Sequence, residues 1–242
     1  MSGARGRMGQ MILSLARGPE YSELIEASGQ IDLGDDPVTQ IKGAQVMIDF
    51  SSPENSIKMA ELCAANGIGF VLGTTGLTIE QKEKIQAHAN RIAVLVSPNM
   101  SLGVNLLFYL TELAAKALPN VEAEIVELHH NQKVDGPSGT AIRMKDIIRN
   151  VTKVAEDKVI HGRHGLVGKR TSGEIGMHAV RGGDTPGDHT VYFFLEGERI
   201  EITHRALSRS VFAHGAIRAA IFLAGKPPGL YSMTDVLGIA HA

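Results

Sequence analysis

The alternation of short apolar runs with helical patterns limits the possible folds of this chain more than any other feature. Runs at 44–50, 69–72 and 92–96 are almost wholly apolar, which is typical of strands buried on both faces of a sheet. Helical patterns that begin at Ser52-Pro53 and at Thr78 separate these runs. The alternation predicts a parallel sheet with right-handed crossovers, whose ligands bind beyond the carboxyl ends of the strands.

A glycine-rich segment precedes the first predicted helix. It runs from Gly3 to Gly9 and leads into a helical pattern formed by Met8, Met11, Ile12 and Leu15. Glycines before a helix let backbone N–H groups approach a pyrophosphate without a Cβ in the way. The spacing is Gly-x-x-Gly-x-x-Gly rather than the commoner Gly-x-Gly-x-x-Gly, so alone it is a weak indicator of nucleotide binding.

A dinucleotide-binding fold places a strand directly before such a turn, but only Met1 and Ser2 precede Gly3. We expect the natural start to lie upstream of Met1. The alternative is that the first strand has been lost, which would expose neighbouring strand edges and make the affinity for a nicotinamide nucleotide poor. The next predicted strand spans 22–28.

The second half of the chain has a different pattern. Alternating residues at 174–181, 189–195 and 199–204 predict a mostly antiparallel sheet, with a hairpin turn at Glu196-Gly197-Glu198. A helix around 211–223 is expected to return to the first domain. The predicted fold class is therefore α/β: a Rossmann-like parallel sheet domain without its usual first strand (1–100 and 209–242) and an α+β domain (101–208). The basic, irregular stretch 158–170 is expected to be a mobile loop.

Composition excludes several classes of function. The formal net charge is −2, without a basic block, which argues against a general nucleic-acid binder. A single cysteine, Cys63, excludes an internal disulfide and suits core packing. No apolar run reaches the roughly 18 residues of a membrane span, and the N-terminus does not resemble a signal peptide, so the cytoplasm is expected. The histidines outside the 129–130 pair form no convincing metal-ligand set, so no metal is expected.

The stretch 127–141 concentrates groups that suit chemistry on an anion. His129 and His130 lie where a predicted strand ends, and Ser138-Gly139-Thr140 lies where a predicted helix begins. The first turn of a helix offers unpaired N–H groups to an anion. Lys133 adds a positive charge, and histidines can exchange protons near neutral pH. Because successive strand residues point to opposite faces, we expect the two imidazoles to have different roles.

The pattern His-His-x-x-Lys-x-Asp-x-Pro-Ser-Gly-Thr-Ala resembles the signature of the 4-hydroxy-tetrahydrodipicolinate reductases, also called dihydrodipicolinate reductases, of the diaminopimelate route to lysine. The resemblance implies reduction by NAD(P)H of the dehydrated form of 4-hydroxy-tetrahydrodipicolinate, a small dicarboxylate, with hydride to ring C4 and a proton to C3. It implies that His129 is a general acid/base and Lys133 a proton donor or electrostatic stabiliser. The substrate carboxylates would be bound by His130, Gly139 and Thr140.

The resemblance also assigns roles to the two domains. The first would bind the dinucleotide, through Gly3, Ala4, Arg5, Gly6, Arg7 and Met8, through Gly73, Thr74 and Thr75, and through Ser97, Pro98, Asn99 and Met100. The second would bind substrate and form a homotetramer. The family often has an acidic-basic pair that aligns with Gly29-Gln30, where this chain has no carboxylate. This absence favours NADPH slightly, without excluding NADH. Arg181 opens another segment that resembles a family segment near the substrate, although it could equally form a surface ion pair.

Two other functions remain open. The first is a different two-domain NAD(P)-dependent dehydrogenase of an aldehyde or semialdehyde, which would need a thiol nucleophile or a differently spaced Lys-His pair; Cys63 lies in the wrong setting. The second is a non-enzymatic nucleotide-sensing module. Such a module would keep the glycine turn but would have no reason to group His129, His130 and Lys133.

Overall fold

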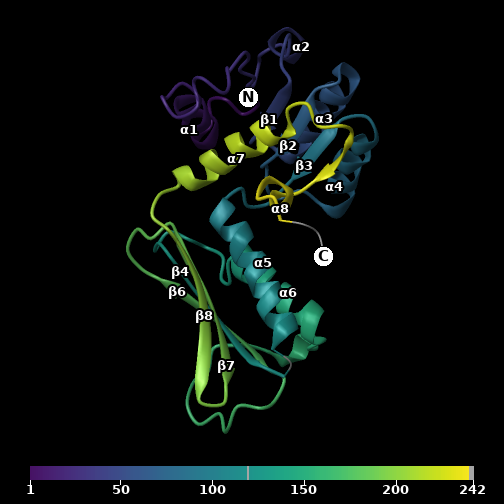
Figure 1. Ribbon diagram of the computed structural model, residues 1–242. Helices are drawn as coiled ribbons and strands as arrows, with labels where there is room; N and C mark the ends of the chain where they lie inside the picture. The colour runs from purple at the N-terminus through teal and green to yellow at the C-terminus, as the bar shows by residue number, and fades with distance from the viewer. Residues whose placement is uncertain (119, 240–242) are drawn as a thin grey trace. The chain divides into compact units, whose positions relative to one another are not determined.

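The computed structural model describes residues 1–118 and 120–239, which form two compact units (Figure 1). Unit 1 comprises Met1–Leu102 and the chain from Ser210 onward, and unit 2 comprises Gly103–Arg209. The divisions thus follow residues 102 and 209, where the sequence suggested 100 and 208. No helix in the described part of the chain is long and apolar enough to cross a membrane.

Unit 1 is built on a parallel sheet in the order β1-β2-β3-β9. Its strands are β1 (Val46–Asp49), β2 (Gly69–Leu72), β3 (Ala93–Val96) and β9 (Gly229–Tyr231). The first three are the apolar runs of the sequence, and they are almost wholly buried. The parallel, Rossmann-like sheet predicted from their alternation with helices is therefore confirmed. The strand β9 has only three residues, too few for a pattern to predict it.

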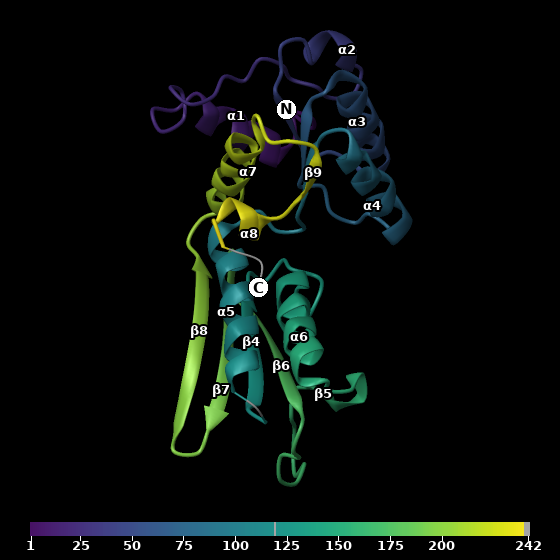
Figure 2. The ribbon, with the colours of Figure 1, turned by 45° about the vertical axis from the view of Figure 1, so that its right-hand side comes forward.

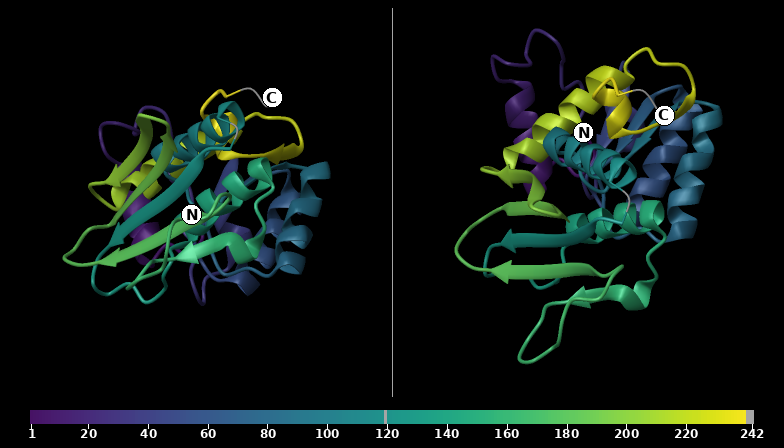
Figure 3. Two further views of the ribbon diagram at one scale, coloured as in Figure 1. Left: turned by 90° about the horizontal axis from the view of Figure 1, so that it is seen from below. Right: turned by 60° about the horizontal axis from the view of Figure 1, so that its bottom comes forward.

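Helices cover both faces of this sheet (Figure 3). One face carries α3 (Pro53–Asn66) and α4 (Ile79–Gln86), which pack on Met47, Phe70 and Val94. The other carries α1 (Arg7–Ala16) and α7 (Ser210–Leu223), which pack on Ile48, Val71 and Leu95. Three short elements complete the unit: α2 (Pro37–Gln40), the 3-10 helix η1 (Ala87–Asn90) and α8 (Met233–Val236).

The predicted helix signals of unit 1 are observed as caps. Ser52 caps α3 ahead of Pro53, and Gly67 ends this helix in the left-handed conformation with φ 68°. Thr78 and Gln81 form the predicted capping box of α4. These local hydrogen bonds explain why the helix boundaries could be inferred from sequence.

The first two residues take the place of a central strand. Ser2 forms parallel bridges to Ile31 on one side and to Asp49 on the other. Its N–H donates to the Ile48 carbonyl at 2.9 Å, and its carbonyl accepts from the Phe50 N–H at 3.1 Å. The strand predicted at 22–28 is wrong, because this segment forms turns and irregular structure.

A cavity of about 330 Å³ lies next to Met1 inside unit 1. Its walls are mostly apolar and include Gly29, Met47 and Ala220. The Met1 ammonium group donates to the Gly29 carbonyl at 2.9 Å. Burial lowers the pKa of this ammonium, because the charged form loses its hydration.

Unit 2 is built on a mixed sheet in the order β5-β6-β4-β7-β8. Its strands are β4 (Glu122–His129), β5 (Val159–His161), β6 (Ile175–Arg181), β7 (Gly187–Leu195) and β8 (Glu198–Ala206). The predicted hairpin is β7-β8, and the pairs β4-β7 and β7-β8 are antiparallel. The pairs β4-β6 and β5-β6 are parallel, because the chain crosses over through a helix between β4 and β5.

The helices α5 (Leu102–Ala117) and α6 (Gly139–Thr152) lie on one face of this sheet (Figure 2). They pack on alternate strand residues such as Ile125, Met177 and Phe193. The opposite face carries large apolar side chains that are exposed in the single chain: Leu128, Val180 and Phe194. The helix α6 ends at Thr152, because Lys153 adopts the left-handed conformation. The 3-10 helix η2 (Glu156–Lys158) follows it.

Candidate functional site

The glycine turn of unit 1 packs closely against neighbouring backbone. The N–H groups of Gly3 and Ala4 both donate to the Ile31 carbonyl, at 2.9 and 3.1 Å. A Cβ at Gly3 would lie 2.1 Å from the Phe50 carbonyl oxygen, and one at Gly9 would lie 2.1 Å from the Gly3 oxygen. Only glycine fits at these two positions, so the turn cannot form with larger residues.

The helix α1 begins directly after this turn. Its N-cap, Gly6, has no side chain to cap the first-turn N–H groups, and the first turn contains no acidic residue. The positive end of the helix is therefore left for an external anion, as in pyrophosphate sites. Arg7 and Met8, the first residues of α1, belong to the predicted cofactor segment. This geometry fits a dinucleotide pyrophosphate.

The other two predicted cofactor segments follow β2 and β3, at the edge where the carboxyl ends of parallel strands meet. Thr74 donates through Oγ1 to the buried Asp49 at 2.8 Å and accepts the Ser51 N–H at 2.9 Å. The Gly73 N–H donates to the Asp49 carbonyl at 2.9 Å. Asp49, which the sequence analysis did not single out, thus joins the loops after β1 and β2.

The segment 97–100 forms a turn of its own. The Ser97 hydroxyl donates to the Asn99 carbonyl at 2.7 Å, and the Asn99 side chain accepts the Ser101 N–H at 2.9 Å. Met100 is buried. The structure therefore brings 73–74 to the same edge of the sheet as the turn at 97–100, in the place where the sequence pattern expected ligands.

Two carboxylates lie close to the glycine turn, contrary to the expectation drawn from Gly29-Gln30. The Arg5 N–H donates to Asp32 at 2.6 Å, and the Arg5 guanidinium pairs with Asp35 at 3.0 Å. The N–H groups of Arg5 and Leu33 hold the pKa of Asp32 below its usual value. Asp32 directly follows Ile31, the residue that bridges to Ser2.

In unit 2, the buried face of β4 presents Glu127 and His129. The Glu127 carboxylate accepts from His129 Nδ1 in a short contact. It also accepts from both terminal nitrogens of Arg181, at 2.9 and 2.8 Å, and from the Ser138 N–H at 3.0 Å. Burial alone would raise the pKa of Glu127, but these hydrogen bonds from His129, Arg181 and Ser138 outweigh it and hold the pKa at about 2.

A second buried histidine, His189, lies beside this pair. Its ring meets the His129 ring edge to face, 5.1 Å between centroids, and its Nε2 contacts the Ser138 hydroxyl at 3.0 Å. The pKa of His189 is lowered to about 3, chiefly by burial and also by the neighbouring His129, His204 and Lys133, while the carboxylate of Glu127 opposes the shift. Lys133 is connected to this group through its loop: its ammonium pairs with Asp135, whose carbonyl accepts from the Arg181 guanidinium that also binds Glu127.

His130 and Lys133 follow the end of β4. The His130 N–H donates to the Thr185 carbonyl at 2.9 Å, and its ring nitrogen Nε2 contacts Arg209 at 3.2 Å. Lys133 reaches Asp135 with an Nζ to Oδ1 distance of 2.6 Å. His129 is 8% exposed, whereas His130 is less buried. The two imidazoles therefore have different environments.

The helix α6 begins at Gly139 and Thr140. Its N-cap, Ser138, accepts the Ala141 N–H at 3.2 Å, and the first turn contains no acidic residue. A Cβ at Gly139 would meet nothing within 4 Å, so the space beside this residue is open. The open helix start suits a carboxylate.

Sequence reasoning missed Glu127 and His189 and left Arg181 undecided. Glu127 lies two residues before His129, so the strand period places both on one face and could have revealed the pair. His189 and Arg181 come from other strands, and local sequence has no signal for those contacts. No group of three or more potential metal-ligating residues occurs within the described residues.

A parallel-sheet unit with a glycine turn before a helix, and a mixed-sheet unit with two buried imidazoles in contact, are features of a two-unit NAD(P)H-dependent oxidoreductase. Residues 1–100 match the family model described as dihydrodipicolinate reductase, N-terminus, and residues 103–237 match dihydrodipicolinate reductase, C-terminus. The chain belongs to the dihydrodipicolinate reductase family.

Similar proteins agree with this assignment. The 4-hydroxy-tetrahydrodipicolinate reductase of Anaeromyxobacter sp. (strain Fw109-5) is 46% identical, over 100% of this chain and 98% of that protein. The corresponding reductase of Geobacter sulfurreducens is 43% identical, over 98% and 97%. A solved dihydrodipicolinate reductase from Paenisporosarcina sp. TG-14, with dipicolinate bound, superposes with a TM-score of 0.77 at 25% identity, covering 97% of this chain and 96% of that one.

Proposed function

We propose that this chain catalyses the NAD(P)H-dependent reduction of the dehydrated form of 4-hydroxy-tetrahydrodipicolinate to tetrahydrodipicolinate, on the diaminopimelate route to lysine. The observation that carries the proposal is the match of both units to this family, in a chain that has His129, Lys133 and the open start of α6 within residues 129–140. The dipicolinate bound to the Paenisporosarcina relative supports a small cyclic dicarboxylate as the substrate class.

Unit 2 would supply the acid-base chemistry. The bound reduced nicotinamide supplies a hydride, in this proposal to ring carbon C4. Negative charge then develops along the conjugated system of the substrate, and Lys133 offsets it and delivers a proton to C3. His129 acts as general acid/base. His130 and the first-turn N–H groups at Gly139 and Thr140 bind the carboxylates.

Unit 1 would hold the cofactor. The pyrophosphate is assigned to the turn formed by Gly3, Ala4, Arg5, Gly6, Arg7 and Met8. The rest of the nucleotide is assigned to two further segments: Gly73, Thr74 and Thr75 after β2, and Ser97, Pro98, Asn99 and Met100 after β3. The slight preference for NADPH rests on the missing acidic residue at Gly29-Gln30. Asp32 and Asp35 oppose it, because they would repel a 2′-phosphate and already engage Arg5. The ratio of kcat/KM for NADPH and NADH in Asp32→Asn and in the parent decides this point.

We assign the exposed sheet face of unit 2 to self-association into a homotetramer. Leu128 and Val180, 37% and 47% exposed, are register partners on the adjacent strands β4 and β6. Phe194, 36% exposed, lies on the same face beside Glu122, at the other end of β4. Exposed large apolar side chains on one face of a sheet are typical of an interface. Sedimentation of the parent and of Val180→Glu tests this: the charged variant should give smaller species.

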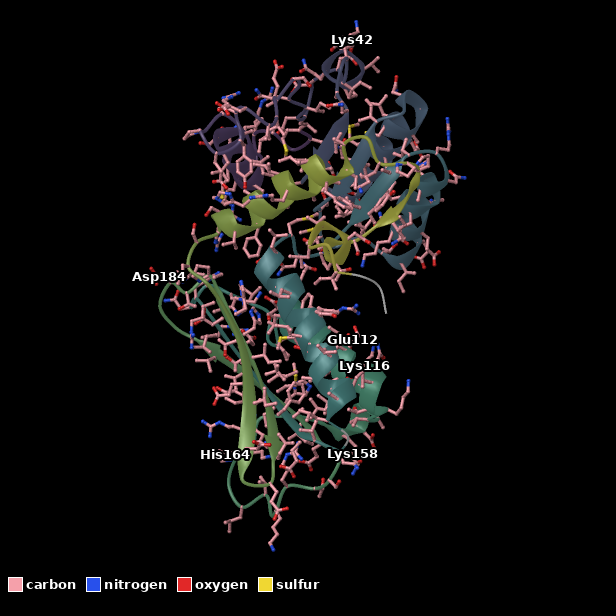
Figure 4. All side chains as sticks on the ribbon, viewed as in Figure 1. Lys42, Glu112, Lys116, Lys158, His164 and Asp184 are labelled. Atoms are coloured by element: carbon pink, nitrogen blue, oxygen red, sulfur yellow. The ribbon has the colours of Figure 1, made fainter. Side chains whose placement is uncertain are left out.

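Lys133→Ala tests the proposed chemistry. Its kcat should fall by about 10²–10⁴-fold, the usual contribution of a positioned acid or base, without a change in thermal unfolding. Lys116→Ala is a matched control, since Lys116 makes an exposed ion pair with Glu112 at 2.6 Å on α5 (Figure 4). Near-normal turnover in Lys133→Ala would remove this residue from the mechanism.

Substrate dependence separates the proposal from its two rivals. Oxidation of NAD(P)H should require the cyclic pathway intermediate. A different dehydrogenase would respond to a small aldehyde instead, and a sensing module to neither. Against the first rival stands Cys63, which is fully buried, and burial raises the pKa of its thiol to about 12. Such a thiol is inert as a nucleophile.

A further inference from the structure

We infer that Glu127 is a positioning residue, which fixes the tautomer and orientation of His129 and is itself held in place by Arg181. The inference rests on the proposed function, in which His129 exchanges protons with substrate. Glu127 would not touch substrate and would act only through the imidazole.

The contacts of the carboxylate determine what it can do. Oε2 accepts from His129 Nδ1 and from Arg181 Nη1, and Oε1 accepts from Arg181 Nη2 and from the Ser138 N–H. An ionised carboxylate can only accept hydrogen bonds. Nδ1 of His129 must therefore carry its proton, and Nε2 is the atom left to take up or release a proton.

Arg181 supplies the charge that keeps this carboxylate ionised while buried. The side chain of Glu127 is 1% exposed, and a buried charge needs a partner. The bidentate contact meets this need through both carboxylate oxygens, so His129 need not be protonated for Glu127 to stay charged. Arg181 Nη2 also donates to the Asp135 carbonyl at 2.6 Å. The same guanidinium thereby ties the loop that carries Lys133 to the strand that carries His129.

The imidazole is also confined on its other sides. His189 stands against it edge to face, and its low pKa keeps His189 neutral at working pH. Gly187 passes close to the ring, since a Cβ there would lie 2.8 Å from Nε2. The ring is therefore held at Nδ1 and flanked elsewhere, which is the arrangement that a general acid/base requires.

A matched carboxylate on the same strand separates positioning from simple stabilisation. Glu124 lies on the opposite face of β4 and pairs with Arg163, Arg170 and His178. Burial would raise the pKa of Glu124, but these partners hold it at about 2, as for Glu127. A purely structural role predicts similar consequences for the loss of either charge. A positioning role predicts that only Glu127 affects the histidine.

The experiment compares Glu127→Gln and Glu124→Gln in the full-length chain. Glu127→Gln should lower kcat by about 10–100-fold, as for other groups that orient a functional histidine, while KM changes little. The acid limb of its kcat profile should move to lower pH, because a protonated imidazole loses the carboxylate that stabilises it. Glu124→Gln should keep the kcat and pH profile of the parent. Equal kcat and pH profiles in the two variants would overturn the inference.

Nitrogen-15 NMR of the histidine side chains gives a readout that does not depend on turnover. In the parent, His129 should show a proton on Nδ1, with its signal shifted far downfield, and this signal should be lost in Glu127→Gln. An Nε2-protonated tautomer in the parent would overturn the inference even if the chain is an active reductase. Absence of turnover in the parent would instead contradict the proposed function and leave the NMR result to decide the tautomer.

Arg181→Lys covers the case in which Glu127→Gln does not fold. It keeps a positive charge but cannot make the bidentate contact. The inference expects a smaller fall in kcat and a weakened downfield signal. An unchanged signal together with unchanged kcat would show that His129 does not need the bidentate contact between Arg181 and Glu127.

Discussion

The sheets of the two units are held together in different ways. In unit 2 the strands β4, β7 and β8 pair along 7 to 9 registered positions, and the sheet is continuous from β5 to β8. In unit 1 the named strands have three or four residues, and the position between Ile31 and β1 is filled only by Ser2. A cavity of about 330 Å³ remains beside it. The sheet of unit 1 is therefore stabilised more by the helices packed on it, and the sheet of unit 2 more by hydrogen bonds between its strands.

The buried carboxylates show the same contrast. Asp49 in unit 1 accepts from the hydroxyl groups of Ser51, Ser56 and Thr74. Glu127 in unit 2 is held by a guanidinium, an imidazole and an N–H group. Neutral donors suit a site that must organise loops around a ligand. Charged donors suit a site that must control a proton, because they fix the protonation state of the carboxylate. We therefore expect the stability of unit 1 to depend on strand pairing and that of unit 2 to depend on the protonation of buried side chains.

The largest effect should come from lengthening the pairing beside β1 in unit 1. Four apolar β-branched residues added before Met1 should stabilise this unit by a few kcal/mol at most. Burial of aliphatic side chains, about 2 kcal/mol each, and new backbone hydrogen bonds, about 1 kcal/mol each, are largely offset by about 1–2 kcal/mol of backbone entropy for each ordered residue. They would fill the cavity, extend the pairing of β1 and remove a buried ammonium group. Hydrogen exchange of the peptide that covers 44–50 measures the change.

A Gly-Ser extension of the same length is the control, because it removes the ammonium group but cannot fill apolar space. Equal protection of 44–50 from hydrogen exchange in both extended chains would contradict the idea that strand pairing limits the stability of unit 1. Protection of β4 in unit 2 should be unaffected by either extension.

Most elements of the fold could be predicted from local sequence patterns, and the exceptions depend on contacts between distant residues. The strands β1, β2 and β3, the caps of α3 and α4, and the β7-β8 hairpin all follow from spacing within one element. The strand predicted at 22–28 failed because strand formation requires a partner, and composition contains no information about the length of the neighbouring strand. The stretch 158–170, expected to be a mobile loop, is tied through Arg163 and Arg170 to Glu124 on another strand.

The candidate site was predictable to the same extent. His129, Lys133 and the start of α6 lie within one stretch of sequence, and their grouping could be read directly. Arg181 forms hydrogen bonds with Glu127, 54 residues away in the sequence, and His189 contacts Ser138, 51 residues away. Such contacts follow from strand order, which local patterns do not fix. The acid near the glycine turn was missed for the same reason, since the pairing of Ser2 with Ile31 decides which residue lies there.

Acid should weaken unit 2 by an intermediate amount. The pKa of His189 is about 3 in the folded chain against 6.5 ordinarily, so below pH 6.5 the unfolded state binds a proton that the folded state does not. Stability is then lost as the pH falls, by about 2 kcal/mol between pH 6.5 and 5. The buried carboxylates of Glu124 and Glu127, with pKa values of about 2, add to this loss only below their ordinary value of 4.5.

His189→Gln removes the titrating ring and keeps a polar group for Ser138. Urea unfolding at pH 6.5 and pH 5 should show a much smaller difference in this variant than in the parent. The lowered pKa of His204, which is caused by its burial, acts in the same direction and should leave a residual slope. An undiminished slope in His189→Gln would assign the acid sensitivity to other groups.

The smallest change should come from a substitution that crowds the His129 ring in unit 2. A methyl group at Gly187 would lie 2.8 Å from His129 Nε2, so the ring must shift although Glu127 holds its other nitrogen. Gly187→Ala should lower kcat by roughly tenfold, or about 1.4 kcal/mol, with little change in the KM for cofactor. The same substitution in a His129→Ala background should lower kcat no further, because the ring it displaces is gone, while the positive φ of Gly187, 155°, destabilises the Ala variant in both backgrounds. An equal loss in both backgrounds would show that Gly187 acts through the backbone of β7 rather than through the imidazole.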